Sequence, residues 1–509
     1  GIEEYVAPEV VNCTFDGELT QGAEYVNGQY TYRYKQEGAY SSTTDLVWNN
    51  IGTDGWGVQL TDKASTDAVT DSVCTYINNV PVTSMAYMYY KSKTSSINLT
   101  NVNTSKVTSM SGMFGATQVT SLDLSNFDTN KVTDMFGIFQ ETQIEALDLS
   151  NFDTSNVTNM SQMFYNSKAT TLDLSNFDTS NVTNMSSMFY HSQATSIDLS
   201  SFDTSNVTSM GGMFRESYAK ILDLSSFETS NVTAMSEMFS YSSAKTLDLS
   251  NFDTSNVTIM AQMFRSSKAI TLNLSNFDTS RVKNMSFMFC DSAATEIKGL
   301  ENFNTEKVEN MNFMFASSKV ANLDVSNFNT SKVTNMSGMF KESYAEVLDL
   351  SNFDTSKVTN MTAMFYDSAA TEIKGIDKID TSNVTDMGGM FSGSKAKSLD
   401  LSRFNTSKVI SMRNMFRDTL FTTLNLSSFD TSNVTNMEGM FYNNKNLVTI
   451  YASNKFITDN VTSSIDMFYD ASNLIGGNGT KYNEYNVDKE YARVDGGTSS
   501  PGYFTLKSN

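Results

Sequence analysis

A 25-residue period runs through most of this 509-residue chain and largely decides what the chain can fold into. It is marked by a Met-Phe pair whose phenylalanine recurs every 25 residues from Phe114 to Phe289 and continues to Phe468. Single-residue insertions, at EIKGLENF and EIKGIDKI, lengthen two of the later steps. With a partial copy ending at Tyr90, sixteen copies of this half-motif extend from Val82 to Phe468. A fixed period of this length predicts a solenoid, whose copies cannot fold alone and must stack on one another.

Each copy has two halves with different periodicities. The segment 169–175 (ATTLDLS) alternates apolar and polar residues, which is the pattern of a short strand. The segment 182–189 (VTNMSSMF) spaces its apolar residues three or four apart, which predicts one or two helical turns with Asn181 or Thr183 as the cap. The sequence therefore predicts an α/β repeat solenoid. This is a leucine-rich-repeat-like stack of about 15–16 coils, each with a short parallel strand and a short helix or 3-10 turn.

The two ends of the chain differ from the repeats. The prolines, Pro8, Pro81 and Pro501, all lie outside the array, and proline is tolerated at the ends of stacked strands rather than within them. Alternating runs such as QYTYRYKQ near the start predict β-hairpins, and the last residues are glycine-rich and end in a strand-like PGYFT. We predict a β-rich N-terminal capping domain over 1–80, a solenoid over 81–468 and a C-terminal cap over 469–509.

Two columns of aspartates recur in the array and supply the candidate functional residues. The first column, between the strand leucines, contains Asp123, Asp148, Asp173, Asp198, Asp223 and Asp248. The second column follows the phenylalanine of the FDTS motif and contains Asp128, Asp153, Asp178, Asp203, Asp253 and Asp278. Carboxylates stacked about 5 Å apart repel one another, so both columns need an explanation.

The first column is expected on the exposed side of the sheet, either as a plain solvated surface or as part of a ligand-binding surface. For the second column, capping of an Asx turn is favoured over a calcium ligand. No cofactor is expected, and a calcium ladder is the weaker alternative. Lys298 and Lys374 replace the first-column aspartate in two copies, and neither an RTX-type nonapeptide nor an EF-hand loop occurs.

The other repeated residues are interpreted as structural. The methionines represented by Met185 are expected to fill the core, because methionine is flexible and apolar. The threonine represented by Thr179 is expected to bond the local backbone of a turn. Cys290 and His191 fall in variable columns, which predicts exposure.

Composition excludes several classes of protein. The chain has 35 Lys+Arg against 56 Asp+Glu, a net charge of −21, whereas nucleic-acid binding requires a basic surface. No run of 18 apolar residues predicts a membrane span, so no membrane insertion is expected. The chain has one histidine and lacks a zinc-ligand spacing, a phosphate-binding loop, a dinucleotide fingerprint and a nucleophile elbow. We therefore predict that it is not an enzyme.

Cysteine spacing leaves the redox state open. Cys13 and Cys74 lie in the same N-terminal segment and form a possible disulfide, but without geometry an unpaired state is equally expected. The chain begins at Gly1 in an already polar stretch without a signal peptide, so we expect a mature or trimmed piece of a longer protein.

The repeat phrases LDLSNFDTSNVTNMSSMF and DTSKVTNMSGMF resemble the BspA-type leucine-rich-repeat surface proteins, whose repeat is also known from mycoplasma lipoproteins. The flanking GWGVQLTDK, CTYIN and YARVDGG segments are similar to those that accompany such repeats. The resemblance implies a secreted or surface-anchored bacterial protein that adheres to host matrix proteins, epithelial cells or other microbes. It implies no catalytic residue, and because no anchor segment of the family is expected within this sequence, the mode of attachment stays open.

The array and the resemblance together predict an extracellular adhesin at the bacterial cell surface. Its solenoid surface would bind a host extracellular protein, a glycan or another bacterial surface through many weak, repeated contacts. The alternative is a structural spacer or a self-assembling filament subunit, because unpaired strands at the caps can template end-to-end association. A monomer and an end-to-end assembly are both compatible with the sequence.

Overall fold

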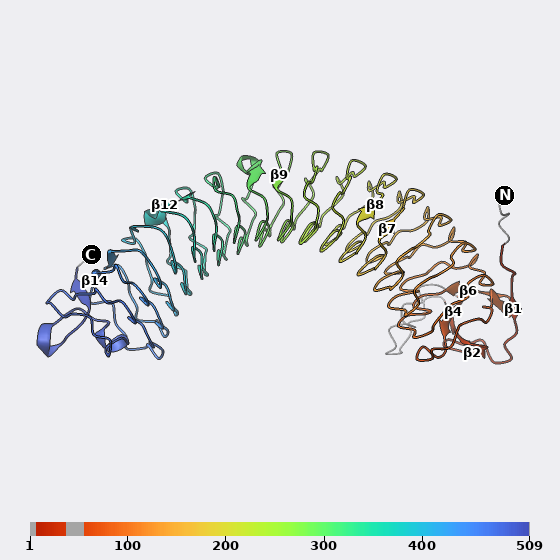
Figure 1. The fold of residues 1–509 in the computed structure, drawn as a ribbon, viewed down its shortest axis with the longest axis horizontal. Helices are drawn as coiled ribbons and strands as arrows, with labels where there is room; N and C mark the ends of the chain where they lie inside the picture. Colours follow the sequence, from red (N-terminus) through yellow and green to blue (C-terminus); the bar gives the residue numbers. More distant parts are fainter. Residues whose placement is uncertain (1–6, 37–54, 508–509) are drawn as a thin grey trace. The chain divides into compact units, whose positions relative to one another are not determined.

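The computed structural model describes residues 7–36 and 55–507. The repeats form a β-solenoid of about 15 turns of stacked parallel strands (Figure 1). The chain divides into two compact units, Gly1–Asn256 and Val257–Asn509, here called the first and the second unit. No helix among the described residues is long and apolar enough to cross a membrane.

The first unit begins with a six-stranded sheet. Its strands are β1 (Asn12–Cys13), β2 (Glu24–Asn27), β3 (Tyr30–Lys35), β4 (Gly55–Leu60), β5 (Tyr76–Ile77) and β6 (Val80–Ser84), in the order β1-β5-β6-β4-β3-β2. Alternating side chains of β3, Tyr30 and Tyr32, are fully buried, and the Tyr30 hydroxyl lies 2.8 Å from that of Tyr89 in the first coil. Of the predicted N-terminal cap, residues 1–6 and 37–54 lie outside the described residues.

The core of each coil is the set of apolar columns that the period predicts. Val182, Met185, Met188 and Phe189 are all fully buried, as are their counterparts along the array. Phenylalanine rings of successive coils lie face to face: in the first unit, the centroids of Phe164 and Phe189 are 5.7 Å apart, with planes 7° apart. Stacking thus covers rings that a single coil would leave in water.

The predicted helix is wrong, because Asn184 forms a parallel bridge and residues 186–190 form turns. The Met188 amide donates to the Met185 carbonyl oxygen at 3.2 Å, whereas the amide of Ser187 donates to Gly211 of the next coil at 2.8 Å. Ser187 also has a φ of 55°, in the left-handed region, which no right-handed helix contains. Within the described ranges, no α-helix occurs. Three-residue turns space buried side chains as a helix does, so the apolar pattern could not distinguish such turns from a helix.

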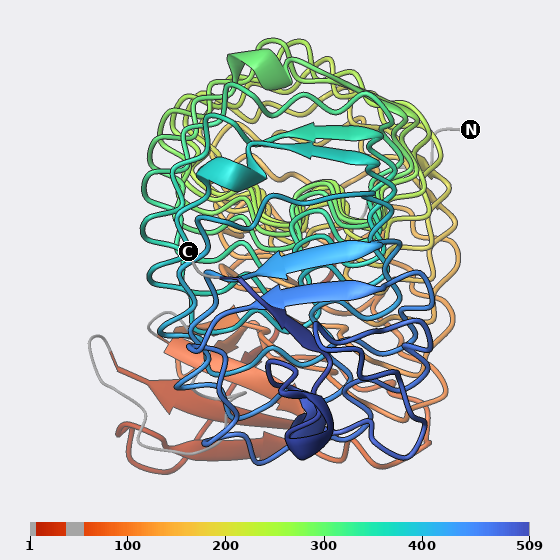
Figure 2. The same cartoon turned by 90° about the vertical axis from the view of Figure 1, so that its left-hand side faces the viewer.

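Parallel strands join successive coils on two sides. On one side, single parallel bridges such as Asn184 with Ser209 repeat from coil to coil. On the leucine side, short strands pair in register: β7 (Thr171–Leu172) with β8 (Ser196–Ile197) in the first unit. In the second unit (Figure 2), these pairs are β9 (Thr271–Asn273) with β10 (Glu296–Lys298), and β11 (Val347–Asp349) with β12 (Glu372–Lys374). The two 26-residue coils continue into short 3-10 helices, η1 (Leu300–Asn302) and η2 (Ile376–Lys378).

The second unit ends in a three-stranded sheet. Its strands are β13 (Thr423–Leu426), β14 (Thr449–Ala452) and β15 (Phe504–Leu506), all parallel, and two further 3-10 helices, η3 (Lys489–Tyr491) and η4 (Gly497–Ser499), precede β15. The ring of Phe504 lies edge-on to Phe441, Phe456 and Phe468. The C-terminal segment therefore covers aromatic side chains of the last coils.

Candidate functional site

The first aspartate column forms one Asx turn per coil. Oδ1 of Asp173 accepts hydrogen bonds from the amide of Ser175 at 3.1 Å and from its hydroxyl at 2.7 Å. The bond from the amide two residues on recurs, at 3.0–3.1 Å, in Asp123, Asp148, Asp198, Asp223 and Asp248. All six side chains are exposed. One carboxylate oxygen thus shapes the corner of the coil, and the column lies on the surface.

The negative charge of this column is not needed for the turn. Asn273 occupies the same place in the second unit and accepts the amide of Ser275 at 3.1 Å, and Asn425 accepts the amide of Ser427 at the same distance. An amide oxygen therefore replaces the carboxylate without loss of the corner. The fold accounts for an acceptor at this position, but not for a carboxylate.

The turn also keeps the aspartates ionised. The Ser175 hydroxyl, together with its amide, lowers the pKa of Asp173 below its ordinary value. The same two donors lower the pKa of Asp123, Asp148, Asp223 and Asp248. The neighbouring carboxylate in the column, Asp148 beside Asp123 for example, has a smaller and opposite effect. At neutral pH this surface is therefore a row of carboxylates.

This row is confined to the first unit. In the second unit the equivalent positions carry mixed residues, namely Asn273, Lys298, Asp324, Asp349, Lys374, Asp400 and Asn425. The register of β11 and β12 places Lys374 directly opposite Asp349, and the lysine is one of the groups that lower the pKa of this aspartate. The two units thus share a backbone corner but present different charges.

The second aspartate column forms the Asx turn that its FDTS motif predicts. Oδ1 of Asp178 accepts the amide of Ser180 at 3.0 Å and its hydroxyl at 2.6 Å. A third corner of the coil has the same design, with Asn184 accepting from Ser186 at 2.9 Å. The recurring Asx-x-Ser triplets are the signal of these corners in the sequence, and only one of the three corners was predicted from them.

The threonine column joins neighbouring coils, which corrects its prediction as a local turn hydroxyl. Oγ1 of Thr179 donates to the carbonyl oxygen of Asp203 at 2.9 Å and accepts the amide of the same residue at 2.8 Å. Asn181, predicted as a helix cap, instead donates through Nδ2 to the carbonyl oxygen of Ser155 in the preceding coil at 2.7 Å. Both columns therefore connect neighbouring coils.

The cysteines are not members of the aspartate row, and the described residues form no cluster that could bind a metal ion. Cys13 and Cys74 form a disulfide, with Cα atoms 5.9 Å apart, that ties β1 to the segment before β5. Cys290 is half-buried, and this burial raises the pKa of its thiol. Among the residues that the structure describes, no three or more His, Cys, Asp or Glu side chains form a group that could hold a metal ion.

Comparison with known proteins identifies a family. No curated protein and no solved structure matches the chain. Five overlapping segments, residues 64–170, 137–246, 217–298, 290–373 and 367–482, match one repeat family, and together they cover well over half of the sequence. The chain therefore belongs to the family described as "Mycoplasma protein of unknown function, DUF285".

Proposed function

We propose that this chain is a BspA-like leucine-rich-repeat adhesin of the bacterial cell surface, secreted or anchored. It acts without catalysis and binds a host extracellular protein, a glycan or a neighbouring microbe through its solenoid surface. The surface in question is the row of six aspartates in the first unit.

The observation that carries the proposal is the charge of that row. Asn273 and Asn425 show that an uncharged acceptor makes the same corner, yet each of the six positions from Asp123 to Asp248 carries a carboxylate. A repeated exposed charge without a structural role is consistent with recognition of a basic partner. Because the row repeats in successive coils, weak contacts add up to high avidity.

The disulfide supports an extracellular location. Disulfides persist in oxidising compartments and are rare in the cytosol. The Cys13–Cys74 bond lies in the first unit, where it holds the short edge strand β1. An extracellular cap would therefore retain this bond in the mature protein.

The test is binding of the purified chain to immobilised fibronectin, mucin and epithelial cells. The variant carries Asp173→Asn, Asp198→Asn, Asp223→Asn and Asp248→Asn, which keeps an acceptor in each turn and removes four charges. The matched control makes the same change in the second column, at Asp153, Asp178, Asp203 and Asp253, where Asn329 and Asn405 provide native precedents in the second unit. We expect binding to fall at least tenfold in the first variant only. Equal binding by both variants would count against this surface, and no binding by any form would count against an adhesin.

The alternative proposal is a spacer or self-assembling subunit, and the edge strands favour it. Val26 on the edge strand β2 is 57 % exposed, and Leu506, beyond the bridge that pairs Phe504 of β15 with Val494, is 56 % exposed. Apolar side chains on an unpaired edge promote pairing with another chain. Sedimentation over a range of concentrations tests self-assembly. Growing assemblies that Val26→Lys or Leu506→Lys abolishes would support it, and a strict monomer would exclude it and leave only the spacer.

A further inference from the structure

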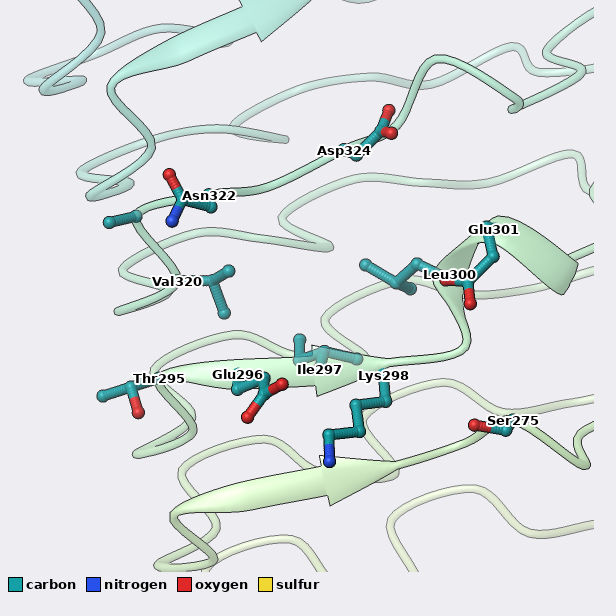
Figure 3. A pocket seen from close by; sticks show the side chains of 11 residues that line it. Ser275, Thr295, Glu296, Ile297, Lys298, Leu300, Glu301, Val320, Asn322 and Asp324 are labelled. Carbon is teal, nitrogen blue, oxygen red and sulfur yellow. The ribbon is translucent and has the colours of Figure 1, made fainter.

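The second unit contains a recess on its leucine side, beside the first 26-residue coil (Figure 3). The recess has a volume of about 660 Å³ and lies between residues 295–301 and residues 320–324. Its apolar lining comes from Ile297, Leu300 and Val320. Polar side chains from both coils surround these three residues.

The inserted residue explains why the recess is there. Gly299 has a φ of 96°, and a Cβ at this position would lie 2.5 Å from the carbonyl carbon of Leu274. The insertion coil is therefore held tightly against the preceding coil, where the Leu274 amide donates a hydrogen bond to the backbone carbonyl oxygen of Lys298 at 2.8 Å. Between residues 295–300 and 320–325, all of them described, no backbone hydrogen bond is formed. The insertion coil therefore bonds its backbone to the preceding coil but not to the following one.

Of the charged side chains of the recess, only Asp324 has a role in the frame, because it accepts the amide of Ser326 at 2.9 Å in the corner of its coil. Glu296, Lys298 and Glu301 make no side-chain hydrogen bond or ion pair with any part of the chain that the structure describes. Elsewhere, the recurring polar side chains of the coils are engaged in corners or between coils, as in Asp173 and Thr179. Uncommitted groups that line a hollow remain available to a ligand.

The same residue types accompany the second insertion. Glu372 and Lys374 lie on β12 as Glu296 and Lys298 lie on β10, and Asp377 follows where Glu301 follows in the first insertion coil. One difference is Lys397, which occupies the position that Ala321 holds in the coil after the first insertion. The insertion and its charged residues thus occur together twice in one unit.

The lining selects the class of ligand. Carboxylates of Glu296, Glu301 and Asp324 accept hydrogen bonds, while the Lys298 ammonium and the Asn322 amide donate them. The lysine would repel a cationic ligand and the three carboxylates would repel an anionic one, so neither charge suits the whole lining. A neutral saccharide suits all of it, because its hydroxyls donate and accept while its C–H faces lie against the apolar residues.

We infer that this recess binds a unit of a neutral saccharide. The inference deepens the proposed function, since it names a class of ligand and places it in the second unit, whereas the aspartate row belongs to the first unit. The recess is open to one side, which suits a residue within or at the end of a longer chain rather than an enclosed small molecule.

The test is binding of the full chain to immobilised neutral oligosaccharides ending in galactose, N-acetylglucosamine, fucose or mannose. Sialylated and sulfated forms of the same oligosaccharides and a lysine-rich peptide serve as charged comparisons. The variant is Lys298→Ala with Glu301→Ala; a second variant adds Lys374→Ala and Asp377→Ala. The matched control is Lys268→Ala with Glu346→Ala, two exposed residues outside the lining.

We expect a neutral oligosaccharide to bind, the first variant to weaken binding at least tenfold, the second to weaken it further, and the control to leave it unchanged. Neutral binding that survives both variants, or preference for the charged probes, overturns the inference. If the unmodified chain binds fibronectin but none of the neutral oligosaccharides, the inference is overturned and the proposed adhesin still stands. If the chain binds neither, both proposals are wrong. A melting temperature equal to wild type shows that each variant is folded.

Discussion

The hydroxyl of Thr179 satisfies both backbone polar groups of Asp203, which lies in the next coil. It donates to the carbonyl oxygen at 2.9 Å and accepts the amide at 2.8 Å. The threonine is fully buried, so its hydroxyl is held in place as the partner of both backbone groups. One side chain therefore joins two coils at a place where the backbones do not bond each other directly.

Replacement of this hydroxyl by a methyl group should open the stack locally. Thr179→Val keeps the shape of the side chain but removes the partner of a part-buried amide and a part-buried carbonyl, which costs about 1–3 kcal/mol of unfolding free energy. The control is Thr183→Val, because Thr183 is exposed and its hydroxyl makes only a 3.3 Å bond to Thr158. Urea denaturation should show a large loss for Thr179→Val and a small one for Thr183→Val. Equal losses would contradict the bridging role.

Glycine should stabilise a corner that now carries a strained residue. Ala363 has a φ of 53°, while the equivalent positions of the neighbouring coils are Gly338 and Gly389. Relief of the left-handed strain outweighs the extra entropy of the unfolded chain, so Ala363→Gly should stabilise by about 0.5–1 kcal/mol. Ala370→Gly is the control, because Ala370 is buried with an ordinary φ and should lose stability. Destabilisation by Ala363→Gly as well as by Ala370→Gly would contradict the predicted strain at Ala363.

The C-terminal segment should lose stability in acid. Burial alone would raise the pKa of Asp495, but hydrogen bonds from Thr480, Gly497 and Asn478 lower it to about 2. The unfolded value is about 3.9, so the stabilisation is complete above that pH and is lost as the pH falls towards 2. Hydrogen exchange of peptides covering 476–506 should be constant from pH 7 to 4, after correction for intrinsic rates, and rise below pH 4.

Asp495→Asn gives the matched comparison for this pH dependence. The variant should exchange faster at neutral pH, because an amide nitrogen replaces one acceptor of these bonds, and it should lack the additional rise below pH 4. A rise of equal size in the variant would assign the acid sensitivity to other carboxylates. Exchange over residues 303–316, whose corners are formed by Asn304 and Asn310, serves as the internal reference.

Reduction should loosen the start of the first unit. The Cys13–Cys74 disulfide closes a loop with a sequence separation of 61 residues. By restricting the unfolded chain, a disulfide that closes a loop of this size adds about 4 kcal/mol to the free energy of unfolding, according to the loop-entropy description. Cys13→Ser with Cys74→Ser should speed hydrogen exchange over residues 7–36. Cys290→Ser, which removes a thiol outside the disulfide, should leave that exchange unchanged, and identical exchange in all forms would exclude a stabilising role.

The sequence by itself determined the solenoid and its core. Because each copy occupies the same environment, the repeated apolar columns could be assigned directly, and Met185, Met188 and Phe189 are buried as predicted. The FDTS corner at Asp178 was also predictable, because an Asx turn needs only residues two positions apart. These features depend on local spacing and on periodicity, which a sequence displays completely.

Only the tertiary structure decided where the remaining hydrogen bonds go. Alternate amides of the Met-Phe segment, such as that of Ser187, bond the next coil, which excludes the helix that the same spacing predicted. Thr179 and Asn181 likewise bond neighbouring coils, and the 61-residue separation of Cys13 and Cys74 gave no information on their contact. The recess beside Gly299 arises because one coil is a residue longer than the next. Each of these depends on groups that are distant in the chain and adjacent only after stacking, so periodicity within one copy did not specify them.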